Sequence, residues 1–281
     1  MMNLKALSYK LREDVIDMIV TGKTGHIGGD MSVMEILVAL YFQQMNISPE
    51  NKDDSNRDLF IMSKGHSVEA YYAVLAEKGF FDIKDVIKQF SKFGSKFIGH
   101  PNNKLPGIEM NSGSLGHGLP VSVGMALAGK MNKKTYRTYV VMGDGELAEG
   151  SVWEGAMAAG HYKLGNLCAV VDRNRLQISG GTEMVMSHDN LYKRFEAFGW
   201  NVIDVADGND IDELNKAFDA AKDVKGKPSV LIANTVKGKG SPVMENNVLW
   251  HHKVPNEDEL KQIRKDLAKR REEASHGKNS K

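Results

Sequence analysis

Cysteine, excess charge and long apolar runs are all scarce in this sequence of 281 residues. Cys168 is the single cysteine, so no internal disulfide can form and a reducing compartment is expected. No run reaches the roughly 20 apolar residues that a membrane-spanning helix needs, and the first residues show no apolar signal core. The formal net charge is +1, which is far from the basic balance of a nucleic-acid-binding domain. We therefore expect a cytoplasmic protein that binds neither membranes nor nucleic acid.

Two common enzyme motifs are also missing. The sequence has no Gly-x-Gly-x-x-Gly between a strand and a helix, which a nicotinamide dehydrogenase would carry. It has no His-Glu-x-x-His either, so its histidines do not show the spacing of a zinc hydrolase. Neither a dehydrogenase nor a zinc enzyme is therefore expected.

Short apolar stretches alternate with helical patterns along the chain. Apolar spacing predicts helices at residues 4–21, 67–79, 83–90, 119–131, 152–159, 191–198 and 210–221. Strands are predicted at residues 59–63, 138–142, 167–172, 201–205 and 229–235. Strands separated by helices predict an α/β fold, a parallel sheet with helices on both faces, in which ligands bind at the carboxyl ends of the strands.

Two regions differ from this regular pattern. Residues 22–29 are predicted to form a glycine-rich loop, after which Ser32 and Glu35 form a capping-box pattern that opens a helix to about Met45. Residues 1–255 are assigned to the α/β domain, and residues 256–281 to a charged C-terminal helix with a flexible tail.

Oxygen-bearing side chains follow two consecutive predicted strands. Gly143-Asp144-Gly145 ends one strand, and Asp172-Arg173-Asn174 ends the next. Glycines let the backbone approach a phosphate closely, and Mg²⁺ prefers oxygen ligands, several of them from phosphates. Gly-Asp-Gly alone is ordinary turn chemistry, but its pairing with a strand-end asparagine is specific. These residues predict a metal and diphosphate site at one sheet edge.

The same blocks resemble the transketolases, a family of thiamine-diphosphate enzymes. The resemblance covers nearly the whole chain in the family's order. Its motifs are Gly25-His26, Ser63-Lys64-Gly65-His66, Gly99-His100-Pro101, Gly113-Ser114-Leu115-Gly116, Gly143 to Gly150, Asp172 to Gly180 and Trp250-His251.

The resemblance implies a cofactor, thiamine diphosphate, held with Mg²⁺, for which Ca²⁺ or Mn²⁺ could substitute. Asp144 and Asn174 resemble the family's metal ligands, and the carbonyl of Leu176 resembles the third. Gly145 resembles a diphosphate contact. The family often has Gly-Pro-Leu where this chain has Ser114, and a small residue where it has Arg175. Backbone contacts tolerate both departures.

Further cofactor contacts are implied at four positions. Gly113, Ser114 and Leu115 resemble the loop that lies against the aminopyrimidine ring. His66 resembles a residue that approaches the cofactor.

Four loop histidines acquire a role from the resemblance. Any one of them alone would read as a surface turn residue. By resemblance, His26, His100 and His251 line the channel for the donor ketose, and His251 also contacts the cofactor, although a one-residue slip would put His252 in its place. The remaining histidines, His117, His161, His188 and His276, are interpreted as structural or solvated.

Three more charged residues have alternative interpretations. Glu149 suits the first turn of a helix, and in the family this glutamate couples to the neighbouring cofactor site across a subunit interface. Lys237 and Lys239 could approach a phosphate, but solvated loop lysines are the interpretation we prefer.

A partner chain is also implied. In transketolases the glutamate that activates the aminopyrimidine belongs to a pyrimidine-binding domain of the opposite subunit, and no segment up to Lys281 has room for that domain. The expected enzyme is a split transketolase, a self-associating heterotetramer with a separate C-terminal subunit. It would move a two-carbon ketol unit from a ketose phosphate to an aldose phosphate, as in the pentose phosphate pathway.

Two alternatives stay open from the sequence. One is half of another thiamine-diphosphate enzyme, such as 1-deoxyxylulose-5-phosphate synthase or a transketolase for an unusual sugar. The other is a non-catalytic regulatory subunit that keeps cofactor binding, against which the intact Asp144 and Asn174 argue.

Overall fold

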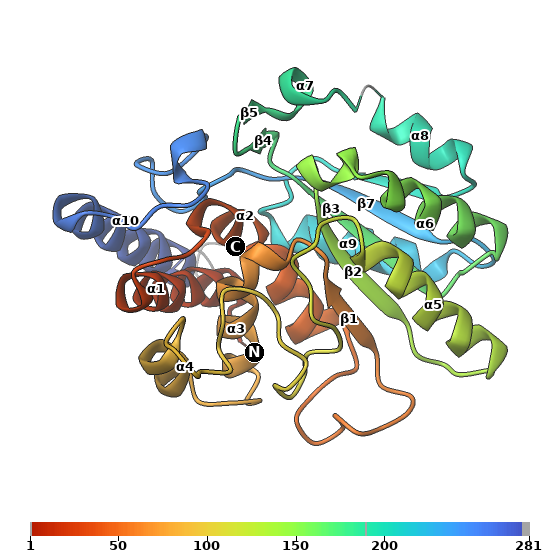
Figure 1. The fold of residues 1–281 in the computed structure, drawn as a ribbon, viewed down its shortest axis with the longest axis horizontal. Helices are drawn as coiled ribbons and strands as arrows, with labels where there is room; N and C mark the ends of the chain where they lie inside the picture. Colours follow the sequence, from red (N-terminus) through yellow and green to blue (C-terminus); the bar gives the residue numbers. More distant parts are fainter. Residues whose placement is uncertain (1, 189, 277–281) are drawn as a thin grey trace.

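The computed structural model describes residues 2–188 and 190–276. Five parallel strands form its central sheet in the order β1-β2-β3-β7-β6 (Figure 1). The strands are β1 (Leu59–Met62), β2 (Thr138–Gly143), β3 (Leu167–Arg173), β6 (Asn201–Val205) and β7 (Ser229–Asn234). All five lie within two residues of the ranges predicted from the sequence. A two-stranded antiparallel ribbon, β4 (Leu176–Gln177) and β5 (Gly180–Gly181), follows β3 in a region predicted only as a polar loop.

Helices precede, connect and follow the strands. They are α1 (Leu4–Gly22), α2 (Ile27–Ala39), α3 (Val68–Glu77), α4 (Ile83–Gln89), α5 (Gly118–Met131), α6 (Gly150–His161), α7 (Thr182–Val185), α8 (Leu191–Ala197), α9 (Ile211–Asp223) and α10 (Glu257–His276). Asp210 caps α9 as predicted, because its carboxylate accepts from the backbone of Asp212 and Glu213. Within the part of the chain that the structure describes, no helix combines the length and apolar character needed to cross a membrane.

The sheet buries both of its faces, because alternate strand residues join different apolar clusters. In β2, Tyr139 and Val141 pack into the cluster formed with α1, α2, α3, α4, α9 and α10. Val140 and Met142 pack into the cluster formed with α5, α6 and α8. Figure 1 shows α5 and α6 on one side of the sheet and α1, α2 and α3 on the other. The predicted α/β fold with two covered faces is confirmed.

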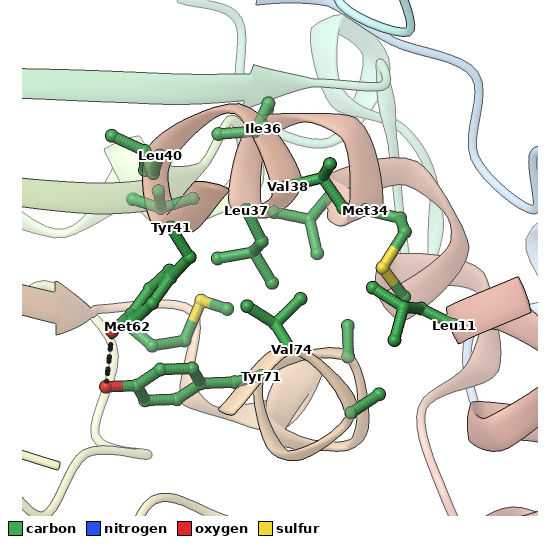
Figure 2. Close-up of a cluster of buried hydrophobic side chains, with 14 of the residues drawn as sticks. Leu11, Met34, Ile36, Leu37, Val38, Leu40, Tyr41, Met62, Tyr71 and Val74 are labelled. Carbon is green, nitrogen blue, oxygen red and sulfur yellow. Dashed lines mark hydrogen bonds between the residues drawn. The ribbon is translucent and has the colours of Figure 1, made fainter. Parts of the chain in front are cut away.

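Helix α2 is buried on every side and forms the centre of the larger cluster. Figure 2 shows Met34 beside Leu11 of α1, and Leu37 facing Val74 of α3. The hydroxyls of Tyr41 and Tyr71 are joined by a hydrogen bond of 3.1 Å. A fully buried apolar side chain contributes roughly 1.5–3 kcal/mol. Helix α2 is therefore a rigid support for the residues at its N-terminus.

The predicted capping box at Ser32 is wrong, because α2 already begins at Ile27. Ser32 lies inside the helix, where its hydroxyl donates to the carbonyl of Gly29 and to Asp172. Gly28 and Gly29, predicted as part of a loop, lie within α2, where the helix packs closely against its neighbours. A Cβ on Gly28 would lie 2.5 Å from the carbonyl oxygen of Trp250, and one on Gly29 would lie 2.7 Å from Oγ of Ser67.

The charged C-terminal segment forms α10, which lies along α1 (Figure 1). Ile263 and Leu267 are its buried side chains. Arg271 donates to Glu13 of α1 at 3.0 Å. The helix continues to His276, so residues 270–276 are ordered on the chain's own surface, and the rest of the predicted tail, residues 277–281, lies outside the described residues. The division into two units at residue 255 stays a prediction.

The buried ion pair between Arg12 and Glu35 gives the first test of this packing. The two side chains are 0% and 3% exposed, and Arg12 also donates to the carbonyl of Met31. We predict that Glu35→Ala lowers the free energy of unfolding by about 3–5 kcal/mol, because it leaves a buried guanidinium unpaired. Urea unfolding of the purified chain measures this. The control is Asp17→Ala, which breaks an exposed pair with Arg264 and should cost under about 1 kcal/mol. Equal losses for the two variants would contradict the prediction.

Candidate active site

Asp144 and Asn174 lie at the same edge of the sheet, as the sequence predicts. Strands β2 and β3 end level with each other, because Gly143 pairs with Asp172. The carboxylate of Asp144 accepts from the backbone N–H of Gly145 at 2.9 Å and of Arg175 at 2.6 Å. The loop after β3 is thus bound directly to the carboxylate that follows β2.

Asp144 is a buried carboxylate with no cation in ion-pair contact among the described residues. It is 5% exposed. Burial and the neighbouring charge of Asp172 raise its pKa to about 6. A bound cation would stabilise its ionised form.

The other two predicted ligand oxygens already have local donors. Oδ1 of Asn174 accepts from the N–H of Leu176 at 3.1 Å, and the Leu176 carbonyl accepts from Nζ of Lys237 at 3.0 Å. Each oxygen keeps a second lone pair. A carboxylate, an amide oxygen and a carbonyl are the ligands that Mg²⁺ prefers, so the donor set fits this ion. Among the described residues no group of three His, Cys, Asp or Glu side chains could hold a metal.

Lys237 is buried, so its interpretation as a solvated loop lysine is wrong. Its side chain is 1% exposed and donates both to the Leu176 carbonyl and to Nδ1 of His251, at 2.8 Å. Burial, then the charge of Lys64, lowers its pKa to about 8, and Asp144 and Asp172 oppose that shift. A lysine next to glycines carries no sequence signal of burial, because only the fold packs it beneath α2.

Lys64 is a second buried lysine that the sequence reasoning left without a role. Its Nζ contacts Asp172 at 2.5 Å, with side chains 2% and 0% exposed, and donates to the carbonyl of Gly29. Asp172 also accepts from the hydroxyls of Ser32 and Thr235. Lys64 is therefore paired with Asp172 at this end of the sheet, and Lys237 is a second buried ammonium near the same edge.

The four histidines predicted to line the donor channel and approach the cofactor form one cluster. The ring of His26 lies 5.3 Å from His66, 6.1 Å from His100 and 5.7 Å from His251, measured between centroids. His66 and His251 are 5.4 Å apart. His26 is the residue that precedes α2, and His66 lies in the turn (Gly65–Ser67) that leads into α3. Two helix starts and two loops thus bring together residues far apart in the sequence.

These histidines are neutral at neutral pH. Burial is the main cause, with nearby charges adding to it, and it lowers the pKa of His26 to about 4 and that of His251 to about 3. The pKa of His66 is well below its usual value, and that of His100 is lowered by burial. Neutral imidazoles both donate and accept hydrogen bonds, which suits contacts to sugar hydroxyls.

His252 also belongs to the cluster. Its ring centroid is 4.7 Å from that of His26, and its Nε2 contacts the hydroxyl of Thr24 at 3.3 Å. His252 is exposed, whereas His251 is half-buried against Lys237. The choice between the two for substrate contact stays a prediction in favour of His251.

The predicted aminopyrimidine loop lies against the histidine cluster. Gly113 has φ +143°, and a Cβ there would lie 2.7 Å from Cδ2 of His100. Ser114 is exposed and Leu115 is half-buried. Glycine is required at position 113 by both its backbone and its neighbour, while Ser114, the departure from the family pattern, is free of packing constraints.

Glu146 fixes that loop and was missed by the sequence reasoning. Its carboxylate accepts from the hydroxyl of Ser63 and from the N–H groups of Gly116 and Gly143. Glu149 is exposed, and its side chain lies against Gly116. An exposed Glu149 is compatible with an interface role, which stays a prediction.

Arg175, the other departure, adopts φ +65°. A residue with a Cβ is strained in this left-handed region of the backbone. Its guanidinium contacts Oδ1 of Asn234 at 3.4 Å, beside β7. The other histidines are dispersed: His117 and His161 are exposed, and His276 is exposed on α10, while His188 is buried near Asp144.

A family model described as "Transketolase, thiamine diphosphate binding domain" matches residues 5–274. The chain belongs to the transketolase family. The resemblance deduced from the strand-end and histidine motifs is thereby confirmed, and with it the chain's place as the transketolase subunit that carries the thiamine diphosphate binding domain.

Relatives of similar length are named as transketolase subunits. The chain is 45% identical over 278 residues to an apulose-4-phosphate transketolase subunit of Phocaeicola vulgatus, covering 99% of this chain and 98% of that protein. It is 40% identical over 246 residues to the 6-deoxy-6-sulfo-D-fructose transketolase subunit SqwG of a Clostridium species, covering 87% of this chain and 89% of that protein.

Solved transketolases share the fold along nearly the whole chain. The Campylobacter jejuni enzyme superposes with a TM-score of 0.89 at 30% identity, covering 95% of this chain but 43% of that one. The Leishmania mexicana enzyme gives 0.87 at 28% identity, with 100% and 46% covered. The chain therefore spans less than half the length of these single-chain transketolases.

Lys237 gives a test of the site. We predict that Lys237→Met lowers thiamine diphosphate affinity at least about tenfold, since a charge-assisted contact to a buried partner contributes about 1.5–3 kcal/mol. Titration calorimetry with Mg²⁺ present measures the affinity. The control is Lys239→Met, two residues away and less buried, which should bind as the wild type does. Equal affinity for both variants would contradict a role for Lys237.

Proposed function

We propose that this chain is the cofactor-binding subunit of a two-chain transketolase, which moves a two-carbon ketol unit from a ketose phosphate to an aldose phosphate. The observation that carries the proposal is the histidine cluster beside the buried Asp144–Asn174 edge, within a transketolase thiamine diphosphate binding domain. The buried sheet edge supports a cofactor site, and the neutral imidazoles beside it support a separate site for the sugar.

Asp144, Asn174 and the Leu176 carbonyl are proposed to hold Mg²⁺ in this site, with Ca²⁺ or Mn²⁺ as substitutes. Gly145 and the segment Gly113 to Leu115 are proposed as backbone contacts, together with His66. Thiamine diphosphate, when bound, supplies the electron sink for the two-carbon unit. The chain's own groups bind, orient and exclude water.

His26, His100 and His251 are proposed to act on the donor sugar, and His251 on the cofactor as well. Breaking the C2–C3 bond of the ketose requires that the C3 hydroxyl proton leave, and a neutral imidazole can accept it and return it to the acceptor. Burial keeps the imidazoles of His26 and His251 neutral above about pH 4, and it also lowers the pKa of His100. Glu149 is proposed to couple the site to the neighbouring copy.

A second chain with the pyrimidine-binding domain is proposed as the partner. The relatives named as transketolase subunits and the double length of the single-chain enzymes support this. Exposed apolar side chains also adjoin site residues in sequence: Ile98 precedes His100, Leu249 precedes His251, and Ile178 follows Leu176. Exposed apolar groups around a site mark a contact surface. We propose a cytoplasmic heterotetramer.

The proposal is tested by titrating this chain against its partner. Activity is followed as aldose-dependent consumption of xylulose 5-phosphate, and it should rise to saturation near a 1:1 ratio. Robust turnover by this chain alone, with contamination excluded, would overturn the two-chain proposal. Apulose 4-phosphate and 6-deoxy-6-sulfofructose serve as further donors, because the relatives are named for those sugars. Formation of 1-deoxyxylulose 5-phosphate from pyruvate would favour the synthase, and an inactive but cofactor-binding complex would favour the regulatory alternative.

For the metal site, we predict that Asp144→Ala abolishes Mg²⁺-dependent binding of thiamine diphosphate without unfolding the protein. The variant removes the one carboxylate of the proposed donor set. Asp144 is buried but forms no ion pair among the described residues, so the substitution removes no stabilising ion pair. Calorimetry on the partnered enzyme measures affinity, and circular dichroism checks the fold. Unchanged affinity would remove Asp144 from the site.

For the histidines, we predict that alanine variants of His26, His100 and His251 lose about 10²–10⁴-fold in kcat/KM for the ketose, which is the range of general acid–base catalysis. Cofactor affinity should change far less. Steady-state kinetics with calorimetry separates the two. His252→Ala is the matched control, and a wild-type His251→Ala beside an impaired His252→Ala would reassign the role to His252.

A further inference from the structure

Two buried carboxyl groups lie beneath the histidine cluster and belong to none of the contacts assigned above. Asp30 lies in the first turn of α2, and Glu69 lies in the first turn of α3. Both side chains are 0% exposed. Each group reaches across to the other helix. Glu69 accepts from the backbone N–H of His26 at 3.3 Å, and Asp30 accepts from that of Ala70 at 3.0 Å.

The two side chains are also hydrogen-bonded to each other. Oδ2 of Asp30 and Oε2 of Glu69 are buried, and no other hydrogen-bond partner among the described residues reaches them. Two buried carboxyls in contact cannot both ionise, because the repulsion and the desolvation cost are too large. Burial, then the charge of Asp30, raises the pKa of Glu69 well above its usual value, and burial raises that of Asp30 to about 7. Glu69 is thus the member that keeps the proton.

We propose that Asp30 and Glu69 share one proton and act as a brace between the N-termini of α2 and α3, which fixes His26 and His66 for the reacting sugar. They are positioning residues, because they touch the histidines' helices and not the substrate. The carboxyl group of Glu69 is tightly packed. A Cβ on Gly25 would lie 2.5 Å from Oε1 of Glu69. Lys64, which follows β1, lies near enough to Asp30 for its charge to act on that carboxyl. The kinetic consequence rests on the proposed function.

If the two carboxyls share one proton, the effect of the double variant should differ from the sum of the effects of the two single variants. In Glu69→Gln the amide oxygen still accepts from His26 and the amide N–H donates to Asp30. In Asp30→Asn the amide oxygen still accepts from Ala70 and the amide N–H donates to Glu69. In the double variant two N–H groups face each other, so a donor is left unpaired.

The experiment compares these three variants with Glu69→Ala and with the exposed control Asp212→Asn. Each single amide variant should stay within about threefold of wild-type kcat/KM. The double variant and Glu69→Ala should lose at least about tenfold, mainly in kcat, since an unpaired buried group costs about 1–3 kcal/mol. The melting temperature of the chain alone should follow the same order. Effects of the two amide substitutions that simply add would overturn the proposal.

Infrared spectroscopy of the chain alone provides a readout independent of turnover. The wild-type spectrum should contain a protonated carboxylic-acid band that Glu69→Gln removes, and the absence of that band would also overturn the proposal. If the wild-type complex is inactive, the proposed function fails while the infrared and melting data still decide the brace. If the complex is active and the non-additive pattern is absent, only the brace fails.

Discussion

The carboxylate of Asp172 is the interaction on which the rest of the site depends. It lies at the end of the central strand β3, and it accepts hydrogen bonds from Ser32 of α2, Lys64 after β1 and Thr235 after β7. A charge buried at 0% exposure is tolerated only when it is fully paired, and here the partners come from three separate elements. Satisfying this one carboxylate therefore fixes the place of α2 over the sheet edge.

That constraint divides the site into two electrostatic parts. The sheet edge holds buried lysines beside the carboxylates of Asp144 and Asp172, which is a setting for a metal ion and a diphosphate. The helix ends hold imidazoles that burial keeps neutral, so they offer hydrogen bonds without attracting the phosphate. Lys237 joins the parts, because one ammonium contacts both Leu176 and His251.

Regular elements and strand-end residues were predictable, whereas buried charges were not. Hydrophobic periodicity located every central strand, and the rule that parallel strands end at one edge placed Asp144 near Asn174. The start of α2 was misplaced because Ser32 and Glu35 match a capping box locally, while their actual partners, Asp172 and Arg12, are distant in sequence. Lys237 was misjudged for the same reason.

The layered α/β architecture, the strand-end oxygens and the family were predictable from the sequence, because they depend on local periodicity and on short motifs in order. Which polar groups are buried, and which residues they contact, became visible only in the folded chain. Glu146, Lys64 and the pair Asp30–Glu69 look like surface residues in the sequence, yet each is buried beside the site. Their burial follows from how α2, α3 and the strand ends meet, and contacts between segments 30 or more residues apart leave no periodic signal along one chain.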